Sequence, residues 1–311
     1  MWSNILLRVG IIGNGKHSKR IQKILINKKV SFFIYKPRNK LYFDKCNFEI
    51  LKKNKIIFIL SPNSTHFNYI KKLYKNRYIF CEKPPVSSKN QLLKLKRINN
   101  KNIYFNYNTR FSKISNLLNF RNRFKLGKLV YANLVLGHGL ALKKEYKNNW
   151  RANKKRCPKG VFEVVSIHLI DLINFHFKIK KIENPTLMNF SKKGASYDTS
   201  HTKIRLKGNQ IVDIFSSYRT PLIKKNIFIF ENGTIEQNEK LIEIRGPALN
   251  LDKNNFFIKP KLIQKFILNE NKDYQLSLEK SLSFFLKTAS EEKSFDKKIL
   301  ECSLSSNSLL F

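Results

Sequence analysis

The chain has 311 residues, enough for two domains that each bury a core, and its 42% hydrophobic content with 25 phenylalanines excludes wholesale disorder. Sixty-one Lys and Arg against 21 Asp and Glu give a formal net charge of +40, which is typical of nucleic-acid-binding proteins. These basic residues are spread along the whole chain, and the abundance of Lys, Asn, Ile and Phe is what AT-biased codons produce. We therefore assign most of the charge to solvated faces, from which it attracts phosphorylated ligands.

No apolar run approaches ~18 residues, so we expect no transmembrane helix. The first apolar run leads straight into a glycine turn, which is not the layout of a signal peptide. The four cysteines are scattered without a CxxC pair, which predicts reduced thiols, a cytoplasmic protein and no metal site.

The N-terminal segment predicts a dinucleotide-binding turn. An apolar strand over 5–12 runs into Gly13-x-Gly15-x-x-Ser18, and a helical pattern follows. Gly13 permits the tight turn, and Gly15 lets a pyrophosphate approach the helix N-terminus. Ser18 stands where the pattern has its third glycine, so we expect slightly looser packing of helix on strand. The predicted cofactor-binding residues of this turn are Gly13, Asn14, Gly15, Lys16 and His17.

The second predicted strand, over 30–35, lacks the acidic residue that binds the ribose of NAD about 20 residues after the glycines. Lys36, Arg38 and Lys40 follow instead. Cations at that strand end suit a 2′-phosphate, so Lys36 and Arg38 favour NADP as the cofactor. Lysine is abundant everywhere in this chain, and NAD stays open as the alternative.

The third predicted strand, over 56–60, leads into Ser61-Pro62-Asn63-Ser64-Thr65-His66 and then a helix. Asn63 or Ser64 can cap that helix, with His66 in its first turn. We interpret the segment as a loop over the cofactor, which makes Ser61, Pro62, Asn63 and His66 binding residues. The simpler alternative is a capped helix with an incidental histidine.

The fourth predicted strand, over 78–80, ends in Cys81-Glu82-Lys83-Pro84-Pro85. Ligands of an open parallel sheet bind outside the carboxyl ends of its strands. A lysine held there by a proline-fixed backbone can reach a substrate hydroxyl or carbonyl, so Lys83 is a candidate catalytic residue. Glu82 and Lys83 are also candidate cofactor contacts. The tripeptide Glu-Lys-Pro is common by itself. The predicted dinucleotide-binding elements that precede it are what favour a catalytic role.

A fifth strand, over 103–107, is followed by a predicted domain boundary near Asn116, which divides the chain into domains 1–116 and 117–311. A polar loop over 137–159 contains Trp150-Arg151, and a largely buried helix over 160–175 carries His168 and Asp171 on one face. A histidine on an apolar helix is more often a core residue than a catalyst.

The remaining segments predict a mainly antiparallel sheet with one face covered by the helix of His168. Gly208-Asn209 and Asn232-Gly233 are turn signals between short β-rich runs. These runs span 199–206, 210–218, 226–231 and 234–237, and two helices are expected over 261–268 and 276–290. The fold class is α/β, an N-terminal Rossmann domain with a mostly parallel sheet, followed by an α+β domain with a large open sheet.

The order of these motifs resembles the glucose–fructose oxidoreductase and inositol dehydrogenase (Gfo/Idh/MocA) family. The matching stretches span most of the chain and are Gly10–Gly15, Ser61–His66, Cys81–Pro84, Asn108–Phe111, Gly127–Leu129 and His168–Asp171. The resemblance implies hydride transfer between NAD(P) and a hydroxyl carbon of a sugar or cyclitol, and a second domain whose sheet mediates oligomers.

By this resemblance Lys83 lies near the reacting hydroxyl and His168 is the acid/base, while Arg110, Trp150, Arg151 and Asp171 line the substrate pocket. The family usually has an aspartate four residues before the histidine, where this chain has Val164. Glu163 is one residue earlier, roughly 100° around an α-helix. The proton relay then depends on Lys83 and His168 alone, or the enzyme is impaired.

We therefore expect a cytoplasmic NAD(P)-dependent sugar oxidoreductase that forms a dimer or tetramer through its C-terminal sheet. A weaker resemblance of 244–247 and 255–260 to family members in surface-polysaccharide pathways suggests a nucleotide-linked sugar. The alternatives are a non-catalytic dinucleotide-binding sensor or assembly protein, motivated by Val164, and a nucleic-acid binder, motivated by charge alone. We expect no specific nucleic acid and no membrane partner.

Overall fold

The computed structural model describes residues 8–36, 45–98, 101–247 and 251–311, and they form two compact units. The first unit comprises residues 1–107, 279–309 and 311, and the second comprises 108–278 and 310. This division differs from the predicted boundary near Asn116, and it assigns helix α8 and the part of α7 from Glu279 onward to the first unit. The predicted division followed chain order, whereas the tail folds back onto the N-terminal sheet.

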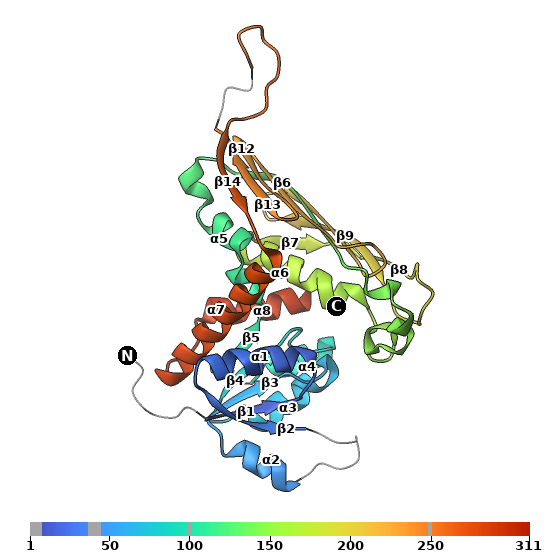
Figure 1. The fold of residues 1–311 in the computed structure, drawn as a ribbon, viewed down its shortest axis with the longest axis vertical. Helices are drawn as coiled ribbons and strands as arrows, with labels where there is room; N and C mark the ends of the chain where they lie inside the picture. The colour runs from blue at the N-terminus through green and yellow to red at the C-terminus, as the bar shows by residue number, and fades with distance from the viewer. Residues whose placement is uncertain (1–7, 37–44, 99–100, 248–250) are drawn as a thin grey trace. The chain divides into compact units, whose positions relative to one another are not determined.

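The first unit is built on a parallel sheet with the strand order β2-β1-β3-β4-β5 (Figure 1). The described strands are β1 (Arg8–Ile12), β2 (Ser31–Tyr35), β3 (Ile56–Ile59), β4 (Tyr78–Glu82) and β5 (Ile103–Asn106). The helices between them are α1 (Lys16–Asn27), α2 (Lys45–Lys52), α3 (His66–Leu73) and α4 (Lys89–Lys96). Each of β3, β4 and β5 is a short apolar run buried along almost its whole length, as expected for a sheet covered on both faces.

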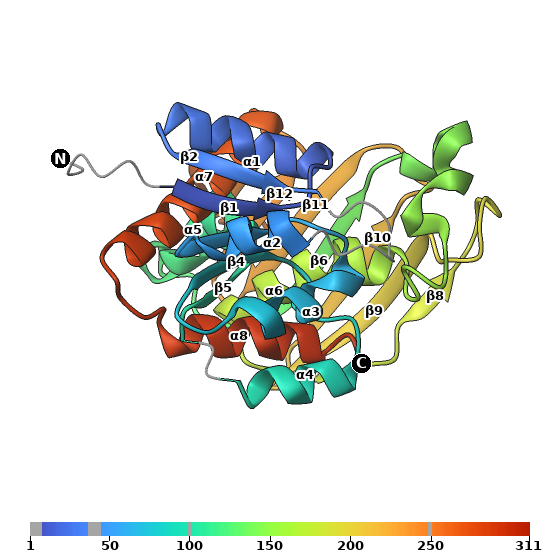
Figure 2. The ribbon, with the colours of Figure 1, turned by 90° about the horizontal axis from the view of Figure 1, so that it is seen from below.

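Two C-terminal helices, α7 (Glu270–Ser290) and α8 (Lys297–Ser308), complete the cover of this sheet. Phe285 of α7 is fully buried, and its ring packs edge-on against Phe58 and Phe80 at centroid distances of 5.4 and 5.2 Å. Phe295, between the helices, stacks on Phe285 at 5.6 Å. Helix α8 lies beside α4 (Figure 2). The tail is therefore part of the first hydrophobic core.

The second unit is built on a mainly antiparallel sheet with the order β14-β13-β12-β11-β6-β10-β9-β7, and β8 pairs with β9. Only β6 and β10 run parallel among the pairs between described strands. The strands are β6 (Leu129–Gly137), β7 (Ile179–Ile182), β8 (Thr186–Met188), β9 (Thr199–Leu206), β10 (Ile211–Ser217), β11 (Ile223–Phe230), β12 (Gly233–Asn238), β13 (Leu241–Arg245) and β14 (Leu262–Ile267). This architecture confirms the predicted fold class.

The inner face of this sheet is covered by helix α6 (Ile167–His176) and the π-helical turn η7 (Phe162–Ser166) that precedes it. Along β11 and β12 buried and more exposed residues alternate, with Phe228 and Ile235 buried at 0% exposure. This alternation places one face of the sheet in the core, and the helix carrying His168 packs on that face. Helix α5 (Lys113–Asn119) and the short turns η2 (Asn108–Phe111) and η3 (Arg121–Phe124) precede β6.

The predicted helix over 261–268 is wrong, because residues Leu262–Ile267 form strand β14. The spacing of Leu262, Ile263 and Phe266 suits a helix as well as a strand, and pairing with β13 decides between them. Strands β7, β8 and β13 and helix α8 were not among the predicted elements.

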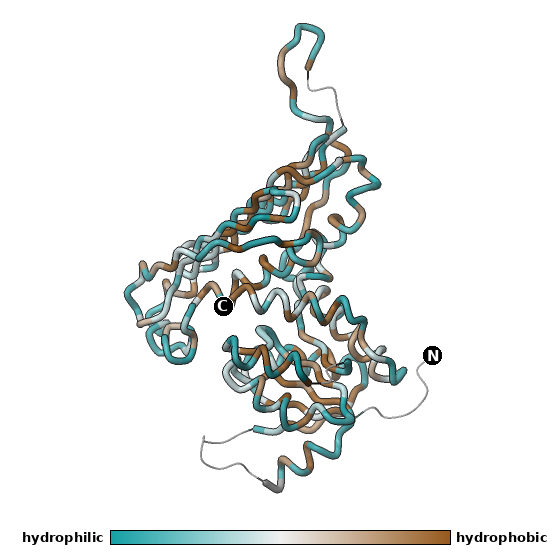
Figure 3. Tube along the Cα trace, turned by 180° about the vertical axis from the view of Figure 1, so that it is seen from behind, coloured by the Kyte–Doolittle hydropathy of each residue, from teal (hydrophilic) through white to brown (hydrophobic). Residues whose placement is uncertain are grey.

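Figure 3 shows hydrophobic colour gathered in the strands of the parallel sheet and hydrophilic colour along much of its helices.

No helix in the described part of the chain is long and apolar enough to cross a membrane. Within the same residues, no group of three or more His, Cys, Asp or Glu side chains could hold a metal ion. Cys81, Cys157 and Cys302 are free thiols.

Candidate active site

The loops that follow β1, β3, β4 and β5 meet at one edge of the parallel sheet, because parallel strands present their carboxyl ends together. Two hydrogen bonds join these loops directly. His17 from the glycine turn bonds to Glu82, and His66 from the loop after β3 bonds to the backbone oxygen of Pro84. The sequence motifs on separate strands therefore form one continuous site in the first unit.

The glycine turn has the geometry that a bound pyrophosphate requires. Gly13 has φ +100°, and a Cβ there would lie 2.8 Å from the Leu60 backbone oxygen, so only glycine fits. A Cβ on Gly15, the N-cap of α1, would meet nothing within 4 Å, which leaves open space in front of the helix N-terminus. The first turn of α1 has no acidic residue, so its N–H groups and dipole favour an anion.

Ser18 replaces the third glycine of the pattern without loosening the turn. It is fully buried, and its hydroxyl donates to the Gly13 backbone oxygen at 2.9 Å. Gln22 donates to the Ser18 hydroxyl and to the Asn14 side-chain oxygen, each at 3.0 Å. The expected looser packing is thus offset by side-chain hydrogen bonds that hold Asn14 over the turn.

A chain of hydrogen bonds runs from the glycine turn through Glu82 to helix α7. The Glu82 Oε1 accepts from the Asn106 amide at 2.7 Å and lies 2.8 Å from the His17 Nε2. The Asn106 Oδ1 accepts from the Ser281 hydroxyl at 2.7 Å, and that hydroxyl is 2.8 Å from the Tyr104 hydroxyl. This network fixes the carboxylate next to Lys83, and every member belongs to the first unit.

Glu82 is held in its ionised form. Burial raises its pKa, but the neighbouring His17, the hydrogen bonds from His17 and Asn106, and the Lys83 charge outweigh burial and lower the pKa to about 2. A negative charge therefore stands permanently beside Lys83 at neutral pH.

His66 ties the loop after β3 to the loop after β4. Its imidazole is fully buried, with Nδ1 2.8 Å from the Pro84 oxygen and Nε2 2.9 Å from the Ser61 oxygen. Burial lowers its pKa, against the opposing effect of the two carbonyl partners. These contacts give His66 a role in holding the loops, and direct cofactor binding by this residue stays a prediction.

The expected side-chain cap of α3 is wrong. Thr65 is the N-cap of α3 and makes no capping hydrogen bond, since its hydroxyl donates to the Pro62 oxygen at 2.7 Å and lies 2.6 Å from the Ser61 hydroxyl. Asn63 and Ser64 lie in the short 3-10 turn η1 (Asn63–Thr65) before the helix. Lys36 is exposed just after β2, and Arg38 lies outside the described residues.

In the second unit, Arg110 and Asp171 bind each other. The guanidinium donates through Nε at 2.8 Å and through a terminal nitrogen at 2.6 Å, and both side chains are almost fully buried. This two-point ion pair joins η2 to the helix that carries the half-buried His168. Asp171 and Arg110 are thus positioning residues for α6, and their contact with substrate stays a prediction.

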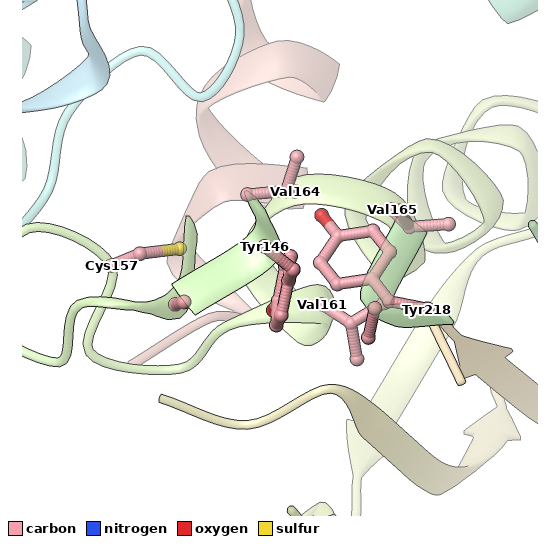
Figure 4. Close-up of a cluster of buried hydrophobic side chains, with 8 residues drawn as sticks. Tyr146, Cys157, Val161, Val164, Val165 and Tyr218 are labelled. Carbon is pink, nitrogen blue, oxygen red and sulfur yellow. The ribbon is translucent and has the colours of Figure 1, made fainter. Parts of the chain in front are cut away.

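Trp150 and Arg151 lie on the short turn η6 (Trp150–Ala152), above a buried cluster from the second unit. The Arg151 guanidinium packs on the Trp150 ring at 4.4 Å from its centroid. Figure 4 shows the buried cluster with Tyr146 and Tyr218 at its centre. The cluster comprises Ala141, Tyr146, Ala152, Cys157, Val161, Val164, Val165 and Tyr218, with Leu136, Leu140 and Trp150 against it.

Val164 belongs to this cluster and is 7% exposed, so the position where the resembled family has an aspartate is apolar here. Glu163 does not replace that aspartate at the surface of the cluster. Its carboxyl is buried near Cys157 and Lys159, and the Cys157 thiol donates to the Gly160 backbone oxygen at 3.5 Å. Burial raises the pKa of Glu163, and the neighbouring Cys157 and Lys159 partly oppose this rise.

Solved structures share this fold. Levoglucosan dehydrogenase, in a complex with NADH and levoglucosan, has a TM-score of 0.78 at 14% identity, over 97% of this chain and 95% of that chain. A myo-inositol dehydrogenase from Corynebacterium glutamicum has a TM-score of 0.71 at 16% identity, covering 98% and 94%. An Agrobacterium radiobacter oxidoreductase, in a complex with NAD+, L-tartaric acid and magnesium, has a TM-score of 0.75 at 13% identity, covering 98% and 94%.

No protein-family model matches the chain, and no curated protein matches it in sequence. The chain shares the fold of these dehydrogenases and oxidoreductases. At these identities the likeness is a likeness of fold, and it carries no residue roles to this chain.

Several residues of the site were not predicted from the sequence. Asn106 stands at the end of an apolar strand, where a polar residue is a recognisable sign of a site edge. Ser281 lies within a long helix, and nothing in its local pattern distinguishes it. Tyr146 was hidden because the loop 137–159 has no periodic pattern that would locate its residues, and Tyr218 ends the predicted run 210–218 with no local sign of a site. The predicted convergence of Lys83 and His168 stays a prediction.

Proposed function

We propose that the protein is an NAD(P)-dependent oxidoreductase that transfers hydride between nicotinamide and a hydroxyl carbon of a sugar or nucleotide sugar. The observation that carries the proposal is the bond between His17 and Glu82, which joins the anion-favouring turn to the residue preceding Lys83. A phosphate-binding turn and a lysine at the same sheet edge suit a dinucleotide and a reacting hydroxyl in one place.

Separate groups of residues would bind the cofactor and transfer the proton. The turn Gly13–His17 would hold the pyrophosphate, and Ser61, Pro62 and Asn63 would border it. A nicotinamide dinucleotide, when bound, supplies the hydride acceptor or donor. Lys83 would bind the substrate hydroxyl and take or return its proton, with Glu82 fixing the lysine's electrostatic surroundings. His168 on α6 is proposed to be the second acid/base group. Lys36 and Arg38 favour NADP over NAD.

We extend the proposal to the assembly of the protein. The outer face of the second sheet has a groove of about 560 Å³ that includes Val135, Phe215 and Leu222 in its lining. Leu222 is 64% exposed and Ile267 on β14 is 81% exposed. Exposed apolar side chains on this sheet, beside polar lining residues such as Lys225 and Glu239, support a dimer or tetramer formed through it. Light scattering would detect a mass above the 36.7 kDa of one chain, and a monomer at micromolar concentration would contradict the proposal.

The activity test is direct. The purified protein, with NADP+ or NAD+, is mixed with a panel of sugars and sugar nucleotides, and the absorbance of reduced nicotinamide is followed. We expect reduction with at least one sugar and tighter binding of NADP+ than of NAD+. Dinucleotide binding without reduction of either cofactor by any sugar would contradict enzymatic activity.

That outcome would favour a second candidate function, a dinucleotide-binding protein without catalysis. The observation behind it is Val164, an apolar side chain where the resembled family has an acid.

Cytoplasmic location and a place in surface-polysaccharide synthesis are also proposals, motivated by the sequence. Specific nucleic-acid binding is not expected.

A further inference from the structure

Arg151 is a half-buried cation of the second unit that no acid among the described residues neutralises. It forms no ion pair with any aspartate or glutamate of the described residues. Arg110, in the same unit, has the opposite arrangement, since it is fully paired with Asp171. Because Arg151 is half-buried, its guanidinium has lost part of its hydration shell. No carboxylate of the described residues makes up for that loss by pairing with it.

Two acids act on the same side chains as Arg151, Asp198 on Tyr146 and Glu163 on Cys157. Asp198 accepts hydrogen bonds from the backbone N–H groups of Phe190 at 3.1 Å and Ser191 at 2.7 Å. It also accepts from the Thr199 hydroxyl at 3.0 Å. Glu163 lies buried near Cys157 and Lys159. Neither carboxylate forms an ion pair with Arg151.

The groups around Arg151 are donors and aromatic rings. Its charge acts on His138, Tyr146 and Tyr218, and it lowers the pKa of each against the dominant effect of burial on the two tyrosines. The Tyr218 ring lies 5.0 Å from that of His138 and 6.0 Å from that of Tyr146. The Tyr146 hydroxyl is buried and makes no hydrogen bond to any described residue. Figure 4 shows the hydroxyl of Tyr218 directed toward Val164.

The loop that supplies these residues is itself strongly basic. Residues 137–160 contain eight Lys and Arg and one acid, Glu145, which is exposed. Lys193 holds the start of this loop, because its ammonium donates to the backbone oxygens of Ala141, Leu142 and Lys143. One kind of ligand would satisfy all of these groups, an anion with several oxygen atoms. It would neutralise the loop and the stacked guanidinium, and it would accept a hydrogen bond from the buried Tyr146 hydroxyl.

We infer that the substrate carries an oxyanionic group, a carboxylate or a phosphate, and that Arg151 is the residue that binds it. The guanidinium fork matches two oxygens of such a group, and stacking on Trp150 fixes the plane of the fork. His138 and the phenols add donors around it. This inference rests on the proposed function, because it takes the loop 137–160 as part of the substrate site. It narrows the substrate from sugars in general to acidic or phosphorylated sugars.

Trp150 provides a local reporter for the test. The chain has two tryptophans, so the Trp2→Phe variant leaves Trp150 as the sole source of tryptophan fluorescence. The full-length variant is titrated, without cofactor, with L-tartrate, with inorganic phosphate and with the neutral polyol threitol. Ionic strength is kept constant with sodium chloride, because a surface of this charge attracts every anion weakly.

We expect a saturable change in fluorescence with tartrate or phosphate and none with threitol. Arg151→Gln in the Trp2→Phe background should weaken that binding by about tenfold or more. Arg156→Gln, which removes an exposed arginine of the same loop, is the matched control and should bind as its parent does. The tighter of the two anions identifies whether the group is a carboxylate or a phosphate.

Equal binding by the Arg151→Gln variant, an equal response to threitol, or no saturable response to either anion would overturn the assignment of Arg151. These outcomes are independent of hydride transfer, since no nicotinamide is present. Failure of the proposed function would appear separately, as the absence of nicotinamide reduction. In an active enzyme, Arg151→Gln should raise KM for an acidic sugar about tenfold and leave kcat largely unchanged.

Discussion

His17 and Glu82 are 65 residues apart in the chain, and the His17 Nε2 lies 2.8 Å from the Glu82 Oε1. The first residue belongs to the turn that favours an anion, and the second precedes the candidate catalytic lysine. The pair therefore links the two halves of the proposed reaction, cofactor binding and proton transfer, through one hydrogen bond. Asn106 and Ser281 extend the link to the C-terminal helix α7.

Replacing Glu82 with Gln should destabilise the first unit in a pH-dependent way. The pKa of Glu82 is lowered from 4.5 to about 2 in the folded protein, which corresponds to roughly 2–3 kcal/mol of stability at neutral pH. Because the folded pKa is depressed, this stability is present above about pH 4.5 and is lost as the pH falls toward 2. Urea unfolding of the wild type and Glu82→Gln at several pH values measures the difference.

The control for this prediction is Glu49→Gln, which removes an exposed acid paired with Lys52. Its effect should stay below ~1 kcal/mol at every pH. A constant difference between the wild type and Glu82→Gln across the acidic range would show that the carboxylate charge is not what stabilises the unit.

Breaking the Arg110–Asp171 pair should be costly because both groups are buried. Arg110→Met or Asp171→Leu alone removes the opposite charge from a buried ion pair, and each should cost about 3–5 kcal/mol of unfolding free energy. The double variant Arg110→Met/Asp171→Leu should be more stable than either single variant. Chemical denaturation of the four proteins gives the coupling energy. Additive losses would contradict a direct interaction, and the exposed Glu301→Gln is the reference for a surface pair.

His176 should make the second unit sensitive to acid. Burial, with the charges of Arg121 and Arg110, lowers its pKa from 6.5 to about 3, so the folded state holds the neutral imidazole. The stability that depends on the neutral form is complete above about pH 6.5 and is lost as the pH falls toward 3. His176→Gln should therefore be somewhat less stable than the wild type at pH 7 and lose less stability on acidification.

Thermal unfolding at pH 7 and pH 5 measures this change for His176→Gln. His201→Gln, which alters a histidine with 46% of its side chain exposed, serves as the control. Parallel losses in the wild type and His176→Gln between the two pH values would contradict the burial of a neutral imidazole.

Phe285 should be required for the parallel sheet although it lies far from it in the sequence. Its buried ring contacts Phe58, Phe80 and Phe295, so Phe285→Ala should cost about 3–5 kcal/mol. Hydrogen exchange should become faster in the strands of the first unit. Leu276→Ala, at a position 47% exposed, should change stability by less than ~0.5 kcal/mol. Faster exchange confined to the second unit would contradict the assignment of Phe285 to the core of the first.

The elements of the first unit were predictable because local chemistry determines them. Gly13 is required by a positive φ and a close backbone approach, and the apolar runs of β3 and β4 are short, buried and bounded by turn residues. Strand β14 was not predictable, because its apolar spacing also fits a helix and only pairing with β13 distinguishes the two.

The same distinction holds for the site. Glu82 and Lys83 follow a strand and can be located from the sequence, whereas Ser281 reaches Asn106 only through the return of the tail. The lack of an ion pair at Arg151 among the described residues cannot be read from the sequence, because ion pairing depends on which residues the fold brings together. Local patterns locate residues at strand ends, and long-range packing decides which of them are paired.

The most direct test of the proposed mechanism is the turnover of Lys83→Met at saturating cofactor, with Lys89→Met as the control at an exposed lysine of α4. We predict unchanged dinucleotide affinity, turnover reduced by ~10²-fold or more in Lys83→Met, and wild-type turnover in the control. Turnover of Lys83→Met equal to that of the wild type would remove Lys83 from the reaction and contradict the mechanism.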